Sequence, residues 1–139
     1  MTRKHIFGAS AALAGLACAF AIGVAVGEQA PPTEAKGMTA SKPTYIDLGA
    51  QELDSLEGRQ LRLRVITLEP GGVAPIHSHK GRPALAYVAQ GTLTEHREGG
   101  WMKQHAVGDT ITEDKTVTHW AENAGDKPTV VIAVDVFKP

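Results

Sequence analysis

The chain has 139 residues, a formal net charge of −1 and 42% hydrophobic residues. This length allows one folded domain at most, and the balanced charge argues against a nucleic-acid-binding protein. Cys18 is the single cysteine and lies near the N-terminus. If the N-terminal segment is removed, the mature protein has no disulfide, thiolate ligand or cysteine nucleophile.

The N-terminal segment is typical of an export signal. Arg3 and Lys4 precede an uncharged run at residues 6–26, and Ala25-Val26-Gly27 offers the small residues that an export peptidase requires. We therefore expect residues 1–27 to be a signal peptide and the mature protein to be periplasmic or secreted. The alternative is an uncleaved anchor, because residues 6–26 are about as long as a membrane-spanning helix. In that case alone the protein would be attached to a membrane.

Residues 28–44 are rich in Pro, Thr, Ala and Gly without an apolar period, which predicts a flexible linker. The folded domain is then expected over residues 45–139. Leu61, Leu63 and Val65 alternate with arginines, the period-two pattern of a half-buried strand. Further strands are predicted in five ranges: 84–89, 92–96, 101–107, 116–121 and 129–137.

Many short strands in about 95 residues predict an all-β domain, a small antiparallel sandwich or barrel. The last strand, residues 130–137, is apolar on nearly both faces. A strand of this kind is either central in its sheet or covered by a second subunit. The sequence thus leaves a homodimer open.

His77 and His79 are one residue apart. Because alternate side chains of a strand share a face, both rings point the same way and can hold one ion. By itself this pair is weak evidence, since two such histidines on an edge strand are more often solvated surface residues.

Two spaced motifs strengthen the metal-site hypothesis. Gly71, five residues, His77-Ser78-His79 and an apolar strand ending at Gly91 resemble the first motif of the cupin superfamily. Gly108, ten residues, His119, three residues and Asn123 resemble its second motif. The resemblance covers nearly all of the domain. It implies a small antiparallel double-stranded β-helix, the cupin or jelly-roll barrel, with one divalent metal ion held by His77, His79 and His119.

The chain departs from the cupin pattern at Ala84, where the first motif normally has a glutamate. Three neutral imidazoles are a sufficient set of ligands for a divalent ion and leave the remaining positions to water or substrate. Without the glutamate the ion would be more Lewis acidic and more open, which suits an anionic or chelating small molecule.

The resemblance implies several functions. The first choice is a mononuclear metal-dependent oxygenase that acts on a small organic molecule, with iron as the metal. Zinc, manganese, nickel and copper are the alternative metals, and a metal-dependent isomerase or hydrolase is the alternative enzyme. The last alternative is a non-catalytic barrel that binds a metabolite or a metal. The sequence assigns no catalytic residue beyond the three ligands.

Other polar and aromatic residues are expected outside the centre. Glu95 lies an odd number of residues from Ala84 and is predicted to face outward unless a bulge at Gly91 shifts the register of the strand. The remaining assignments are His96 and His105 at the surface, Arg82 in an exposed salt bridge, and Trp101 and Trp120 in the core or an interface.

Overall fold

The structure is a computed structural model that describes residues 30–51, 53 and 55–139. The expected signal peptide, residues 1–27, lies outside this part. The described chain is almost entirely β-structure, with short 3₁₀ turns at Gly49–Gln51 and Glu98–Gly100. Its strands are β1 (Lys36–Ala40), β2 (Thr44–Asp47), β3 (Gln60–Ser78), β4 (Ala84–Gln90), β5 (Leu93–Arg97), β6 (Trp101–His105), β7 (Thr110–Glu113), β8 (Thr118–Glu122) and β9 (Thr129–Phe137).

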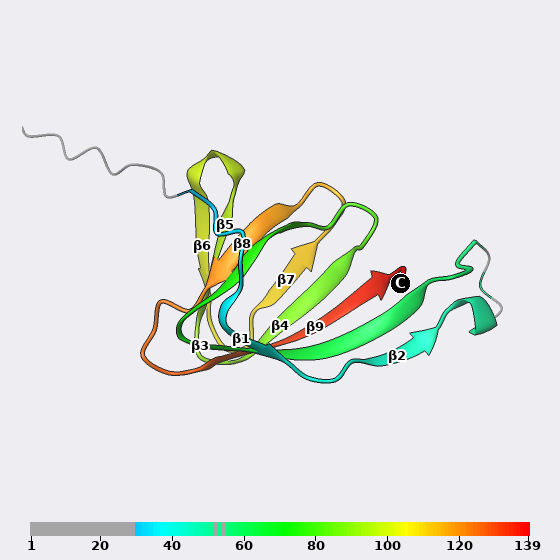
Figure 1. Ribbon diagram of the computed structural model, residues 1–139, viewed down its shortest axis with the longest axis horizontal. Coiled ribbons are helices and arrows are strands. Elements are labelled where there is room, and N and C mark those ends of the chain that lie inside the picture. Colours follow the sequence, from blue (N-terminus) through cyan, green and yellow to red (C-terminus); the bar gives the residue numbers. More distant parts are fainter. Residues whose placement is uncertain (1–29, 52, 54) are drawn as a thin grey trace, which may run out of the picture.

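The strands pair antiparallel in the order β6-β5-β8-β3-β9-β4-β7, and β1 and β2 also pair with β3. The long strand β3 belongs to two layers. Its first half pairs with β9 and its second half with β8. In Figure 1, β3 curves from the layer that contains β4, β7 and β9 into the layer of β5, β6 and β8. This arrangement is the nearly closed, antiparallel double-stranded β-helix that the sequence predicts.

Alternation of side chains builds the core between the layers. In β4 the side chains of Ala84, Ala86 and Val88 are buried, while Leu85 and Tyr87 point outward and are exposed. The central cluster consists of Leu68, Ala86, Val88, Leu93, Ile111, Ala121 and Val131. Burial of such side chains is the main favourable contribution to folding in a domain without disulfides.

The glycine and asparagine of the two motifs meet in space. The Gly71 amide donates to the Asn123 carbonyl at 2.9 Å, and the Asn123 amide donates to the Gly72 carbonyl at 2.9 Å. The buried Asn123 side chain also donates to the carbonyls of Leu68 and Lys127. Asn123 therefore ties β3 to the loop between β8 and β9, which is a structural role.

The linker prediction for residues 28–44 is wrong for its second half. Residues 36–40 form β1, which pairs with β3 between Ile66 and Val73, and β2 begins at Thr44. Most side chains of β1 are exposed, so the segment needs no apolar period. Strand β1 is held by backbone pairing with β3 and by Met38, which packs against the core, and composition does not reveal such pairing.

The location of the protein and its membrane attachment remain predictions. Within the described residues, no helix is long and apolar enough to cross a membrane.

The homodimer also remains a prediction. The outward face of β2, β3 and β4 exposes Ile46, Leu63, Leu85 and Tyr87. A groove of about 310 Å³ on this outward face is lined mainly by apolar side chains, including Leu85. The homodimer is untested.

Candidate metal centre

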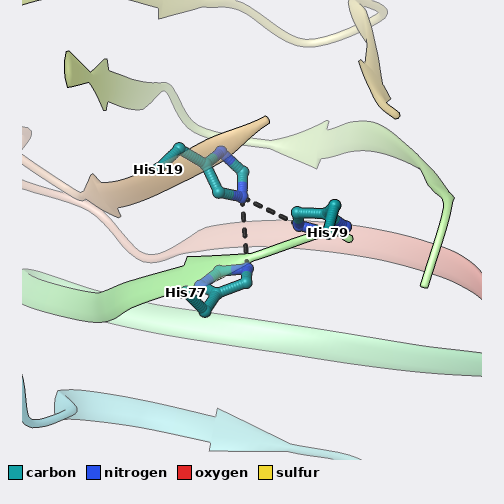
Figure 2. Close-up of side chains that lie close together, drawn as sticks. All are labelled: His77, His79 and His119. Carbon is teal, nitrogen blue, oxygen red and sulfur yellow. Dashed lines mark hydrogen bonds between the residues drawn. The ribbon is translucent and has the colours of Figure 1, made fainter. Parts of the chain in front are cut away.

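The three predicted ligands come together at one point inside the barrel. His77 lies near the end of β3 and is the register partner of His119 on β8. His79 follows the end of β3, where its amide donates to the Val117 carbonyl at 2.9 Å. The His119 Nε2 atom is 3.1 Å from the Nε2 atoms of both His77 and His79. Figure 2 shows the three rings converging through these atoms.

Hydrogen bonds at the opposite nitrogens define which tautomer each ring adopts. The His77 Nδ1 atom is 2.8 Å from the Pro75 carbonyl oxygen, and the His79 Nδ1 atom is 3.1 Å from the Arg82 carbonyl oxygen. A carbonyl oxygen can only accept, so both Nδ1 atoms carry the hydrogen. His119 donates from Nδ1 to a carboxylate oxygen of Glu95 at 2.9 Å. In the neutral rings all three Nε2 atoms therefore present lone pairs.

Three lone pairs that face one another at this separation repel, and a cation between them removes the repulsion. Two nitrogens that each lie about 2.1 Å from one ion are about 3.0 to 3.4 Å apart when the bond angle is about 90° to 110°. The separations of 3.1 Å from His119 Nε2 to His77 Nε2 and to His79 Nε2 match this range, and the ligand atoms of all three histidines lie within 4.8 Å of one another. The residues present thus fit a divalent ion, and no other group of three His, Cys, Asp or Glu ligands was found among the described residues.

Burial keeps the imidazoles in the form that binds metal. Desolvation lowers the pKa of His79 to about 4, against a partly compensating hydrogen bond to the Arg82 carbonyl. Desolvation also lowers the pKa of His77. Both rings are therefore neutral near pH 7, as a metal ligand must be.

Glu95 does not face outward, and that expectation is wrong. Its side chain is fully buried, and its carboxylate accepts from His119 Nδ1, His105 Nε2 and Arg97 Nε at 2.7 to 3.0 Å. Burial alone would raise the pKa of Glu95, but these hydrogen bonds lower it to about 2. A bulge in β4 between Val88 and Gln90 adds one residue and reverses the alternation before β5.

The surface assignment of His105 is also wrong, because His105 is buried beside Glu95. His96 is half-buried. Its ring stacks on Trp120 with centroids 3.7 Å apart, and its Nε2 atom contacts Glu122 at 2.9 Å. Trp120 is buried, as predicted, whereas Trp101 is 42% exposed and lies under the Arg97 guanidinium.

A second carboxylate, Glu113 on β7, approaches the centre and was missed by sequence reasoning. Its Oε2 atom is 3.4 Å from His79 Nε2, and its Oε1 atom is 3.6 Å from His119 Nε2. Burial raises the pKa of Glu113. Glu113 could have been found from the apolar residue two positions before it. Alternate residues of a strand share a face, so a buried Ile111 places Glu113 on the same inward face.

Arginine side chains surround a buried aspartate in the same layer. Asp135 accepts from Arg62 at 2.9 and 2.7 Å and from Arg82 at 3.2 Å, and Arg64 lies 3.5 Å away. Burial would raise the pKa of Asp135, but the hydrogen bond and charge of Arg62 lower it. Arg82 therefore belongs to a largely buried ion cluster and not to an exposed salt bridge, and the barrel interior is more polar than its strand pattern predicts.

The fold and the three converging imidazoles identify the protein as a double-stranded β-helix protein with a candidate metal centre. The model of the cupin domain matches residues 64–135, just over half of the chain, and the protein belongs to the cupin family.

The known proteins that this chain resembles differ widely in length. Auxin-binding protein ABP19b from Prunus persica is 29% identical over 85 residues, which are 58% of this chain and 41% of that protein. The chain thus spans about two fifths of this curated relative. The cupin domain of an XRE family transcriptional regulator from Enterobacter cloacae has a TM-score of 0.56 and 14% identity, covering 75% of this chain and 100% of that chain. Oxalate oxidase in complex with the substrate analogue glycolate has a TM-score of 0.55 and 17% identity, covering 74% and 52%. These structural similarities establish the fold.

Proposed function

We propose that the protein is a mononuclear metal-dependent enzyme that acts on a small organic molecule. The observation that carries this proposal is the convergence of three Nε2 lone pairs whose Nδ1 atoms are all committed to other acceptors. Sites prepared in this way, with the remote nitrogen hydrogen-bonded, are typical of histidine metal ligands. We further propose that the protein acts outside the cytoplasm, free or anchored through residues 6–26.

Oxidation of the substrate by dioxygen is the first choice of reaction. When bound, the ion would supply open coordination positions at which a substrate and dioxygen meet. Glu95 supports this role from behind His119, because its carboxylate holds the imidazole in the tautomer that binds metal. The buried surroundings exclude bulk water from His79 and His119.

The charge of the interior supports an anionic substrate. Arg62, Arg64 and Arg82 contribute three positive charges around the single carboxylate of Asp135. The Arg64 Nε atom is buried and has no hydrogen-bond partner among the described residues. A guanidinium with a free donor is suited to a carboxylate. Oxalate oxidase, a protein of the same fold, acts on a small carboxylate, and we propose that class as the first to be screened.

The test combines elemental analysis with an assay for dioxygen uptake. The protein lacking residues 1–27 is purified, and its metal content is compared with that of His119→Ala. We expect about one equivalent of metal, lost in the variant, and dioxygen uptake with a small carboxylate, diketone, phenol or thiol. One equivalent of iron would support the oxygenase. A zinc protein without uptake would favour the isomerase or hydrolase, and a metal-free protein would contradict the proposal.

A further inference from the structure

We propose that Glu113 is a fourth ligand of the metal ion, supplied by β7 in the space that the short side chain of Ala84 leaves open. The inference rests on the metal centre proposed above, and it changes the donor set from three nitrogens to three nitrogens and a carboxylate. Such a set lowers the net charge of the centre from about +2 to about +1.

The register of the sheet places Glu113 beside Ala84. The two residues are directly paired between β7 and β4, and Ala84 is paired with Asp135 of β9 on its other side. Paired residues on antiparallel strands share a face and lie about 5 Å apart. Because the Ala84 side chain ends at Cβ, a longer side chain from the neighbouring strand can extend over it towards the histidines.

Both oxygens of Glu113 face the ligand nitrogens. The separations are 3.4 Å from Oε2 to His79 Nε2 and 3.6 Å from Oε1 to His119 Nε2. Two donors that share one ion at about 2.1 Å are about 3.0 to 3.6 Å apart for bond angles of about 90° to 120°. The carboxylate is thus at the distance of a ligand and beyond the usual length of a direct hydrogen bond.

The tautomers exclude a hydrogen bond donated by either imidazole as the reason for this contact. His79 and His119 carry their hydrogens on Nδ1, so their Nε2 atoms have none to donate to Glu113. When Glu113 is ionised, as a metal ligand must be, its oxygens and the imidazole lone pairs are all acceptors. A buried cluster that contains only acceptors is stable when a cation lies at its centre.

The affinity of Glu113 variants for a metal ion distinguishes a ligand role of Glu113 from a purely structural role. Metal-free protein is titrated with Co²⁺, and the dissociation constant and visible absorption spectrum are recorded for the wild type, Glu113→Gln, Glu113→Ala and the double variant Glu113→Ala/Ala84→Glu. We expect Glu113→Gln to weaken Co²⁺ binding at least about tenfold and to change the spectrum. Moving the carboxylate to position 84 is expected to restore most of the affinity lost in Glu113→Ala.

The matched control is Glu122→Gln, because Glu122 contacts His96 away from the centre. It is expected to leave Co²⁺ binding unchanged, and circular dichroism with thermal melting verifies that every variant is folded. Unchanged affinity and spectrum in folded Glu113→Gln would overturn the fourth ligand. If His119→Ala still loses Co²⁺ in that case, the three-histidine centre stands and only the Glu113 proposal fails. If the wild type does not bind Co²⁺, both fail.

Discussion

His119 donates its Nδ1 hydrogen to the fully buried carboxylate of Glu95, and its Nε2 atom faces the Nε2 atoms of His77 and His79. The His119 ring therefore has a defined contact at each of its two nitrogens. Because the two nitrogens of an imidazole ring are coupled through its tautomer, the carboxylate behind the ring controls the lone pair in front of it.

Replacement of this carboxylate is expected to weaken metal binding without removing a ligand. In Glu95→Gln the side chain is neutral and presents an amide that can donate to His119 instead of accepting from it. We expect the affinity for Co²⁺ or Zn²⁺ to fall by about 10- to 100-fold. Isothermal titration calorimetry measures this loss against Glu122→Gln as the control. Equal affinities in the two variants would show that Glu95 does not orient the ligand.

Metal retention is expected to persist below the pH at which ordinary histidines release metal. An imidazole with a pKa near 6.5 predicts loss below about pH 6. Burial lowers the pKa of His79 to about 4 and also lowers that of His77, so protons compete only at more acidic pH. Equilibrium dialysis from pH 7 to pH 4 should show nearly full occupancy at pH 6 and a steep loss towards pH 4. A midpoint above pH 6 would contradict the buried, neutral imidazoles.

Asp135→Asn is expected to lower the free energy of unfolding by about 3 kcal/mol, because it leaves buried guanidiniums without their carboxylate. The Asp135 side chain is 1% exposed and contacts Arg62, Arg64 and Arg82. Urea denaturation followed by circular dichroism measures the change.

The lowered pKa of Asp135 also predicts how its contribution to the free energy of unfolding changes with pH. Its stabilisation is complete above the pKa of the unfolded chain, near 4, and is lost as pH falls through the lower pKa of the folded state. The wild type should therefore lose its advantage over Asp135→Asn in acid. A difference that grows below pH 4 would contradict this assignment.

Gly91 tests the turn that follows β4 (Ala84–Gln90), and Gly81, in the loop before β4, is the control. Gly91 and Gly81 have φ angles of +72° and +75°, so alanine is similarly strained at both. A Cβ atom at Gly91 would lie 2.8 Å from the Pro128 carbonyl oxygen, whereas nothing lies within 4 Å of one at Gly81. We expect Gly91→Ala to be less stable than Gly81→Ala by about 1 to 3 kcal/mol. Thermal melting compares them, and equal melting temperatures would exclude the clash.

Much of the fold was predictable because strands carry a local signature. The alternation of Leu61, Leu63 and Val65 predicted part of β3. Strands β4, β5, β6, β8 and β9 were predicted with end errors of at most two residues, and both ends of β9 were correct. Strands β1, β2 and β7 were missed. The first shows no apolar period, and the other two, at Thr44–Asp47 and Thr110–Glu113, have too few residues to display one.

By itself the sequence predicted a small antiparallel sandwich or barrel. Its resemblance to two cupin motifs predicted the double-stranded β-helix and the three candidate histidine ligands, because the spacing within a motif is a local property of the chain. Only the tertiary structure decided which carboxylates join them. Glu95 turns inward through a bulge in the preceding strand, and Glu113 reaches the centre because β7 pairs with β4 at Ala84. Pairing between strands and the parity of alternation past a bulge depend on the packing of the whole barrel.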